Sequence, residues 1–353
     1  MGALIPLRDD LGLGEGYHSP QVAVDVRLNT NESPYPPPRA WRDEVAELVA
    51  TIPFHRYPDR SARALRSALA ELHDVRPEQV FVGNGSNEVL QALFLAYGGP
   101  GRTAATFEPT YALHSHIART TATRVVAGER RDDFTLDLDA VRAVLSEAAP
   151  ELTFLCSPNN PTGRVETEAV VREVLDLAPG LLVVDEAYGQ FAAWSALSLV
   201  DDETALVVVR TFSKTWSMAA ARLGYLVAPA SVVEGLERVI LPYHLDALKQ
   251  AAGVAALRYR AEMEARVKTL VDERERVAAA LAGLPVQTWP SEANFILFRP
   301  LSRPGADVWQ ALVDRSVLVR NCSTWPRLDG CLRVTVGTPD ENDAFLSALS
   351  EVL

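Results

Sequence analysis

The sequence predicts an α/β protein with a large, mostly parallel sheet and a smaller α+β domain after it. Short apolar runs at Leu152–Cys156, Leu181–Val184 and Leu206–Val209 are bounded by turn or polar residues, as expected for parallel strands buried on both faces. Amphipathic segments alternate with these runs, which is typical of α/β folds. The 353 residues are enough for about two domains and a sizeable core.

Three regions are expected along the chain. Residues 1–38 are predicted to form an irregular N-terminal arm, because the segment ends in the proline-rich sequence SPYPPP and prolines prevent regular hydrogen bonding. The large domain is predicted over residues 39–245. Within it, a strand is expected at Gln79–Val82 and a helix at Asn87–Tyr97. The small domain is predicted over residues 246–353. Helices are expected at residues 245–281, at 306–315 and from 340, and strands at 294–298, 317–320 and 331–336.

Composition and charge exclude several classes of protein. The net charge is −12 and no basic block occurs, which argues against nucleic acid as a partner. No apolar run approaches the roughly 18–20 residues of a membrane span, and the N-terminal sequence lacks the pattern of a signal peptide. Three cysteines without CxxC spacing favour a reduced protein with no disulfide framework and no metal site. We therefore expect a soluble, globular cytoplasmic protein.

Only three of the 34 basic residues are lysines, namely Lys214, Lys249 and Lys268. Lys249 and Lys268 lie in helical patterns, where a solvated surface role is the simplest interpretation. Lys214 instead follows the apolar run at Leu206–Val209, within the polar sequence RTFSK. Open α/β sheets bind ligands at the carboxyl ends of their strands. From position alone, Lys214 is compatible with a phosphate contact, a surface charge or a Schiff-base nucleophile.

The other predicted strand ends carry complementary chemistry. The run at Leu181–Val184 is followed by Asp185 and Tyr188, and the run at Leu152–Cys156 by the turn sequence SPNNPTG. The strand at Gln79–Val82 is followed by GNGSNE, whose small residues open a helix, and backbone amides at a helix start bind phosphate. A lysine amine, a carboxylate, a phenol, an amide and a phosphate site are together what a pyridoxal phosphate enzyme requires.

Over nearly its whole length the chain resembles the fold-type I aminotransferases, and within them the histidinol-phosphate aminotransferases. The motifs that carry the resemblance are LNTNESPYPPP, HRYPDR, GNGSNE, EPTY, SPNNPTG, VVDEAYG, RTFSK, RLGY, LPYHL, EANFILF and LRVTVGTPDENDAF. The resemblance implies pyridoxal 5′-phosphate as cofactor and transamination of L-histidinol phosphate with 2-oxoglutarate. It also implies roles for individual residues.

By this resemblance, Lys214 forms the Schiff base with the cofactor and moves the proton, Asp185 pairs with the ring nitrogen, and Tyr188 bonds the ring oxygen. We expect burial and a neighbouring cation to lower the pKa of Lys214. His114 is expected to support Asp185. The remaining cofactor contacts implied are Gly85, Ser86, Asn87, Tyr111, Asn160, Thr211, Ser213 and Arg222.

The resemblance further implies a homodimer. Tyr57 matches a residue that such proteins contribute across the dimer interface to the phosphate of the other subunit's cofactor. Arg333 matches the arginine that grips the α-carboxylate of glutamate, and Arg320 matches one that binds the phosphate of histidinol phosphate, with help from Tyr17. Asn31 is expected at the edge of the substrate site or in a structural role.

Two departures from the family pattern affect the local expectations. Trp216 replaces small residues after the lysine and can reshape its surroundings, and Asn321-Cys322 replaces a proline-containing loop after Arg320. Alternatives on the same fold are an aromatic amino-acid aminotransferase and a decarboxylase of a phosphorylated amino acid. A nicotinamide-dependent dehydrogenase is disfavoured, because GNGSNE lacks the third glycine of that fingerprint. A non-catalytic module is disfavoured because all the cofactor partners are retained.

Overall fold

Two β-sheets organise the residues that this computed structural model describes, residue 5 and residues 22–353. The seven-stranded sheet has the order β2-β8-β7-β6-β5-β3-β4, and β7, β6, β5, β3 and β4 run parallel. β8 is antiparallel to both of its neighbours. The strands of this sheet are β2 (Val80–Gly83), β3 (Thr103–Glu108), β4 (Arg124–Glu129), β5 (Leu152–Cys156), β6 (Leu181–Asp185), β7 (Leu206–Thr211) and β8 (Gly224–Val227).

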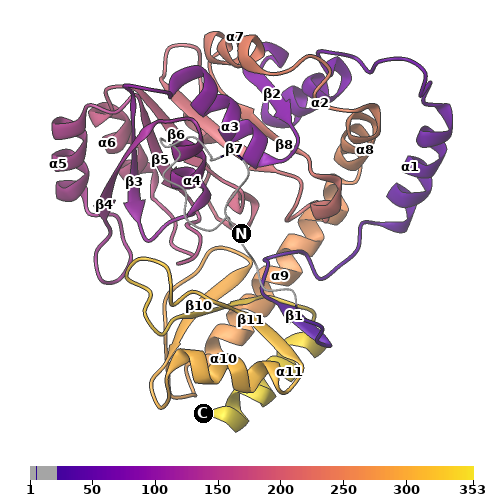
Figure 1. The fold of residues 1–353 in the computed structure, drawn as a ribbon. Helices are drawn as coiled ribbons and strands as arrows, with labels where there is room; N and C mark the ends of the chain where they lie inside the picture. Colours follow the sequence, from indigo (N-terminus) through magenta and orange to yellow (C-terminus); the bar gives the residue numbers. More distant parts are fainter. Residues whose placement is uncertain (1–4, 6–21) are drawn as a thin grey trace.

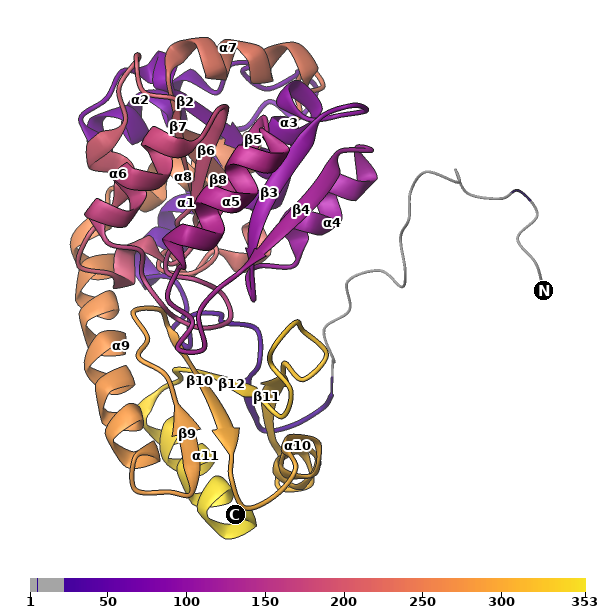
Figure 2. The same cartoon turned by 90° about the vertical axis from the view of Figure 1, so that its left-hand side faces the viewer.

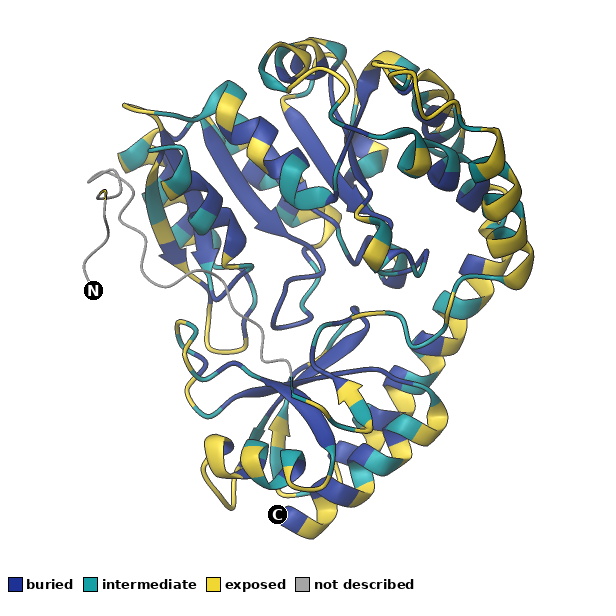
Figure 3. Cartoon of the chain, turned by 45° about the vertical axis from the view of Figure 1, so that its right-hand side comes forward, coloured by how far each residue is buried: buried dark blue, intermediate teal, exposed yellow. Residues whose placement is uncertain are grey.

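Helices cover both faces of this sheet, and strands β5 and β7 near its centre are buried along their whole length (Figures 1 and 3). Aliphatic side chains from the strands pack between the helices, which explains why these strands read as uninterrupted apolar runs. The predicted α/β class is confirmed. The helices of this part are α1 (Arg39–Thr51), α2 (Arg63–His73), α3 (Ser86–Tyr97), α4 (Leu113–Thr120), α5 (Leu138–Ala148), α6 (Glu168–Leu177), α7 (Ala230–Val239) and α8 (Ala247–Leu257).

The second sheet has five strands in the order β1-β11-β12-β10-β9. Its long neighbour α9 extends from the large sheet's helices down along this smaller unit (Figures 1 and 2). The elements here are α9 (Arg260–Leu281), β9 (Val286–Thr288), β10 (Phe295–Pro300), α10 (Gly305–Val313), β11 (Val317–Asn321), β12 (Leu332–Thr335) and α11 (Pro339–Val352). None of the helices in the described part of the chain has the length and apolarity needed to cross a membrane.

One expectation about the N-terminal segment is wrong for three of its residues. Val26–Leu28 form β1, which pairs in parallel with β11 of the small sheet. The strand forms because its partner β11 offers a free edge, a contact between residues far apart in sequence. This pairing positions the following residues, Asn29 to Asn31, between the two sheets.

The helical stretch predicted over residues 245–281 is divided into α8 and α9, although it contains no proline. The break falls at Arg258 and Tyr259, and both side chains contact Glu44 of α1, with the Tyr259 hydroxyl donating to Glu44 Oε2 at 3.0 Å. α8 packs on α1 and α2 of the large unit, whereas α9 leads to the small sheet. The predicted domain limits at residues 38 and 245 stay a prediction.

Candidate active site

The carboxyl ends of β5, β6 and β7 open into one cavity of about 180 Å³ between the two sheets. This edge is where parallel sheets place ligands, as the sequence predicted. Asn29, Thr30, Cys156 and Ala187 contribute to its walls, and none of them was singled out from the sequence. The predicted site residues that line it are Asn31, Ser86, Asn87, Tyr111, Asn160, Asp185, Tyr188, Thr211, Ser213, Lys214, Arg222 and Arg333.

Lys214 lies in the loop after β7, with its amine inside the cavity. Its Nζ donates a hydrogen bond to the carbonyl oxygen of Thr30 at 3.0 Å and lies 5.6 Å from the centre of the Tyr188 ring. Burial, aided by the charges of Arg333 and Arg222, lowers the pKa of this lysine to about 7. A large fraction of the amine is therefore uncharged at neutral pH, as a nucleophile or proton carrier requires.

Asp185 ends β6 and accepts a hydrogen bond from the imidazole of His114. The distance from His114 Nε2 to Asp185 Oδ2 is 2.9 Å, and both side chains are almost fully buried. The other carboxylate oxygen accepts from the backbone N–H of Ala187 at 3.1 Å. His114 is itself fixed between the rings of Phe154 and Tyr111. The structure thus brings His114 to Asp185, as expected from the sequence.

An anion cradle forms where α3 begins, next to β8. Gly85 has a φ of 82°, and a Cβ atom there would lie only 2.8 Å from Nη2 of Arg222. A Cβ at Gly224 would lie 2.3 Å from the backbone nitrogen of Ser86. Glycine at both positions lets the start of the helix approach β8 and the guanidinium closely. Backbone N–H groups at a helix start, together with an arginine, attract a phosphate.

Hydroxyl groups complete this cradle. Arg222 Nη1 donates to Ser213 Oγ at 3.2 Å, and Ser213 Oγ lies 3.1 Å from Thr211 Oγ1. On the facing side, the hydroxyl of Tyr111 donates to Asn87 Oδ1 at 3.3 Å. The predicted cofactor residues after β7 and at the start of α3 therefore face one another across one part of the cavity.

Asn31 connects the N-terminal segment to the site. Its backbone has a φ of 54°, and its side-chain amide donates to the hydroxyl of Tyr188 at 2.9 Å. Two further hydrogen bonds with Thr335 hold it on β12 of the small sheet. Burial raises the pKa of Tyr188, so this hydroxyl stays protonated and available as a donor.

Arg320 and Arg333 are directly opposite each other on β11 and β12. Both side chains are buried, at 7% and 5% exposure. Arg333 donates to the amide oxygen of Asn160 and, at 3.0 Å, to the carbonyl of Asn29. Arg333 therefore lines the cavity, whereas Arg320 lies beside it and is not one of the lining residues.

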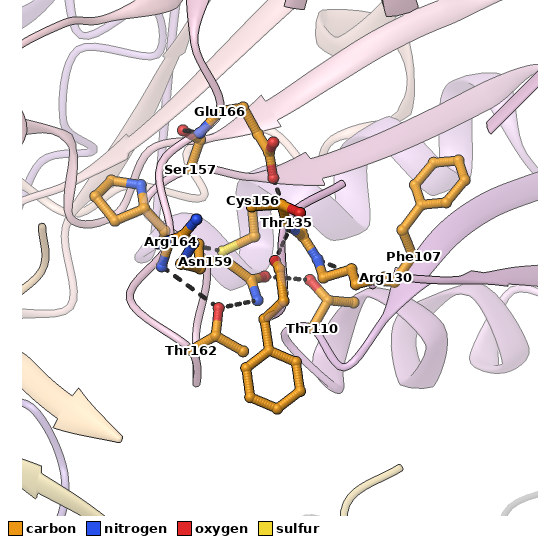
Figure 4. Close-up of polar contacts among 12 residues, drawn as sticks. Phe107, Thr110, Arg130, Thr135, Cys156, Ser157, Asn159, Thr162, Arg164 and Glu166 are labelled. Carbon is orange, nitrogen blue, oxygen red and sulfur yellow. Dashed lines mark hydrogen bonds and ion pairs between the residues drawn. The ribbon is translucent and has the colours of Figure 1, made fainter. Parts of the chain in front are cut away.

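The loop that follows β5 is fixed by a hydrogen-bond network that sequence reasoning missed (Figure 4). Asn159 accepts from Thr110 Oγ1 at 2.8 Å and donates to Thr162 Oγ1, also at 2.8 Å. Close by, the buried pair Arg130–Glu166 has an Nη1 to Oε1 distance of 2.6 Å. The Thr110–Asn159 and Arg130–Glu166 contacts join residues distant in sequence, and no local motif signals them. They hold the loop that presents Asn160 to the cavity.

Among the predicted site residues that the structure describes, Tyr57, Gly85 and Arg320 do not line this cavity. Tyr57 is 81% exposed and stacks on Tyr243 with 4.6 Å between ring centres. Tyr17 lies outside the described residues. Gly85 does not line the cavity, although it packs against Arg222, which does. Trp216, the bulky departure after Lys214, turns away into the core, where it packs on Phe212.

This fold, with its lysine and carboxylate at the carboxyl edge of the large sheet, is that of a pyridoxal-phosphate-dependent transferase of fold type I. The sequence profile "Aminotransferase class I and II" matches residues 23–349, and the chain belongs to this family. It is thus an aminotransferase that depends on pyridoxal phosphate.

Curated relatives with high identity to this chain are histidinol-phosphate aminotransferases. The chain is 46% identical to the histidinol-phosphate aminotransferase of Mycobacterium marinum over 99% of its own length and 92% of the relative's. Identity to the same enzyme of Corynebacterium diphtheriae is 45%, over 99% and 96%. Among solved structures, histidinol-phosphate aminotransferase of Clostridium acetobutylicum matches with a TM-score of 0.86 at 20% identity, covering 93% of this chain and 98% of that one.

A further solved structure was determined with the cofactor. It is histidinol-phosphate aminotransferase from Sinorhizobium meliloti in complex with pyridoxal-5′-phosphate, with a TM-score of 0.85, 22% identity, and coverage of 93% of this chain and 91% of that one. At this identity the likeness shows the common fold.

Proposed function

We propose that this enzyme transfers the amino group of L-histidinol phosphate to 2-oxoglutarate, giving imidazole-acetol phosphate and L-glutamate in histidine biosynthesis. The observation that carries the proposal is the position of two buried arginines, Arg320 and Arg333, on adjacent strands beside the Lys214 cavity. Both substrates are anions, and a guanidinium matches carboxylate and phosphate oxygens well. The 45–47% identity to curated histidinol-phosphate aminotransferases supports the same substrate.

The residues present fit pyridoxal phosphate. The cradle of Ser86, Arg222 and Ser213 suits its phosphate, and Asp185 with His114 offers a carboxylate for its ring nitrogen. When bound, the cofactor accepts the electrons left as the substrate C–H bond breaks. A carboxylate at the ring nitrogen keeps that nitrogen protonated, which favours this acceptance.

The side chains around the cavity then have separate roles. Lys214, with its lowered pKa, takes up and returns the proton at the substrate carbon. Tyr188 and Asn160 would hold the cofactor's ring oxygen, and Tyr111 would lie against its ring. Arg333 binds the α-carboxylate of glutamate. Arg320 binds the phosphate of histidinol phosphate, with Tyr17 and Asn31 at the edge of the substrate site.

We further propose that the enzyme is a cytoplasmic homodimer with shared active sites. Exposed apolar side chains support a second copy of the chain as partner: Phe54 is 70% exposed, Tyr57 81% and Leu241 75%. Helix α1 has no fully buried residue, which is unusual for a helix that packs only within its own chain. Tyr57 of each copy would then complete the neighbouring phosphate site.

Reduction with borohydride tests the cofactor assignment. Purified enzyme is expected to be yellow, and reduction is expected to leave a pyridoxyl group on the peptide that contains Lys214. Lys249 and Lys268, which pair with Asp246 and Asp272, are internal controls in the same peptide map. A colourless protein, or label on either control lysine instead, refutes the assignment.

The choice of amino donor tests the substrate. Histidinol phosphate is expected to give a higher kcat/KM than phenylalanine, and Arg320→Ala is expected to remove most of that preference. If phenylalanine is the better donor and Arg320→Ala changes little, the enzyme is an aromatic amino-acid aminotransferase and the proposed substrate is wrong.

Mixing two inactive variants tests the shared site. Lys214→Ala and Tyr57→Ala impair different halves of each proposed site, so a mixed dimer has one site that carries both changes and one site that carries neither. Restored activity on mixing is expected, whereas a monomer in sedimentation equilibrium, or no restoration, contradicts the dimer.

A further inference from the structure

Trp325 contacts both substrate arginines, although nothing in the sequence singled it out. The guanidinium carbon of Arg320 lies 5.8 Å from the centre of a Trp325 ring, and that of Arg333 lies 6.0 Å from it. Trp325 belongs to the loop between β11 and β12, the strands that carry the two arginines. One aromatic side chain therefore spans a pair of cations that come from opposite strands.

The pairing of β11 and β12 places two positive charges next to each other, and an aromatic ring beside both offsets part of their repulsion. Arg320 and Arg333 are direct cross-strand partners, and like charges in that position repel. Among the described residues, Arg333 forms no ion pair; its acceptors are the neutral oxygens of Asn160 and Asn29. The electron-rich face of a tryptophan attracts a guanidinium, most strongly where water is excluded.

The loop that carries Trp325 is held at both ends. The backbone N–H of Trp325 donates to the Cys322 carbonyl at 2.9 Å, so the ring starts from a fixed turn. Two residues further on, Arg327 reaches the large domain, where it binds the carbonyl of Arg130 and pairs with Asp132 at 2.7 Å. The loop therefore connects the two units at the edge of the substrate site, and the ring cannot easily swing away.

We propose that Trp325 is a positioning residue for the anionic substrates, holding the guanidiniums of Arg320 and Arg333 in the orientations that bind carboxylate and phosphate. This inference rests on the proposed function of the two arginines. An arginine side chain loses rotamer freedom when it binds an anion. A guanidinium already held against a ring loses less, so substrate binding is stronger.

Replacement of Trp325 tests this role. Trp325→Leu is expected to raise the KM for 2-oxoglutarate by about tenfold while kcat is largely unchanged, because cation–π contacts are lost but the reacting groups are not. Trp325→Phe retains an aromatic face and is expected to recover much of the effect. The Kd of holoenzyme for succinate, an unreactive dicarboxylate, is expected to rise in parallel in a calorimetric titration.

Trp289 is a matched control in the same apolar cluster. It also lies against an arginine, with Arg299 at 5.5 Å, but Arg299 does not line the cavity. Trp289→Leu removes the same volume, so it is expected to lower the melting temperature without raising the KM or the succinate Kd. If Trp325→Leu raises these constants no more than Trp289→Leu does, Trp325 is only a packing residue and the inference is wrong.

The two proposals fail separately in this design. The KM for 2-oxoglutarate is measured with whichever amino donor the wild type accepts, so it does not depend on histidinol phosphate. A wild type that rejects histidinol phosphate refutes the proposed substrate alone. A wild type that accepts it, with no effect of Trp325→Leu on either constant, refutes the positioning role alone.

Discussion

Buried arginines occur in two different settings in this enzyme. Arg130 and Arg210 each form an ion pair with a buried carboxylate, Glu166 and Glu186, at 2.6 Å in both cases. Arg333 is buried to a similar degree, yet within the described residues its acceptors are neutral, and its Nε has no hydrogen-bond partner. The first setting supports loops and strands, whereas the second lies in the wall of the cavity.

The difference indicates that some buried arginines stabilise the fold, whereas another is placed to bind a substrate. A buried cation with a fixed carboxylate is compensated, and removing the carboxylate leaves an uncompensated charge that destabilises the protein. A buried cation whose hydrogen-bond acceptors are all neutral oxygens is only partly compensated for the loss of its hydration while no substrate is bound. A substrate anion then supplies the missing charge. Four predictions test this contrast.

The largest effect on activity is expected for Arg333→Leu. Removal of a buried group that is proposed to bind the substrate carboxylate costs about 2–5 kcal/mol, so kcat/KM for glutamate is expected to fall roughly thirtyfold to several thousandfold. The free energy of unfolding, measured with urea, is expected to stay equal or rise, because an apolar side chain replaces a charge without a carboxylate partner. A large loss of stability with activity retained would place Arg333 in the supporting group instead.

The opposite outcome is expected for Glu166→Gln. The charge of Arg130 then stays buried without its carboxylate, and the free energy of unfolding is expected to fall by about 3–5 kcal/mol. The KM for glutamate of the folded enzyme is expected to change little. A double variant, Arg130→Met with Glu166→Leu, removes both charges and is expected to regain most of the stability. If the double variant is no more stable than Glu166→Gln, the ion pair is not the cause.

The sequence predicted one of these settings much better than the other. Lys214 and Asp185 were predictable because each lies near the carboxyl end of an apolar strand, and such ends share one edge of a parallel sheet. Strand β5 has the bounds that its apolar run predicts. The family resemblance supplied Arg333. Local patterns and shared motifs therefore sufficed for the residues that are proposed to meet the cofactor.

The supporting contacts could not be predicted because they join distant segments. The Arg130–Glu166 pair links the end of β4 to the loop after β5, and β1 pairs with a strand almost 300 residues later in the chain. The break between α8 and α9 depends on Glu44 of another helix, so helical periodicity alone predicts a continuous helix. Trp325 was missed for the same reason, since its position is fixed by contacts between the two units.

The ionisation of Lys214 tests the effect of Arg333, the buried arginine in the wall of the cavity. Its pKa is lowered to about 7, chiefly by burial and next by the charge of Arg333. In cofactor-free enzyme, the rate of pyridoxal phosphate capture is expected to rise with pH through a midpoint near 7, because only the uncharged amine reacts. Arg333→Leu is expected to move that midpoint upward. Arg320→Leu is the matched control, since Arg320 is not a cause of the shift, and equal midpoints in the two variants would contradict this assignment.

The smallest effect on activity is expected at His73, in the region of the paired arginines. Burial, with the charges of Arg210 and Arg260, lowers the pKa of His73 to about 3, and its Nε2 lies 2.8 Å from the Tyr225 hydroxyl. The unfolded chain, with an ordinary pKa near 6.5, therefore binds more protons than the folded protein between about pH 3 and 6.5. Stability should consequently fall as the pH falls through this window, by up to about 1.4 kcal/mol per pH unit from this group.

His73→Phe is expected to flatten that acid slope in urea unfolding, because the titrating group is gone, while the KM for glutamate stays the same. Tyr225→Phe removes only the hydroxyl that lies beside the imidazole and is expected to keep the slope, since burial and the two arginines still act on His73. An unchanged slope in His73→Phe would mean that other groups control acid stability. A pH-dependent change in KM would instead mean that the paired region communicates with the cavity, and the separation between supporting and substrate-binding arginines would then be incomplete.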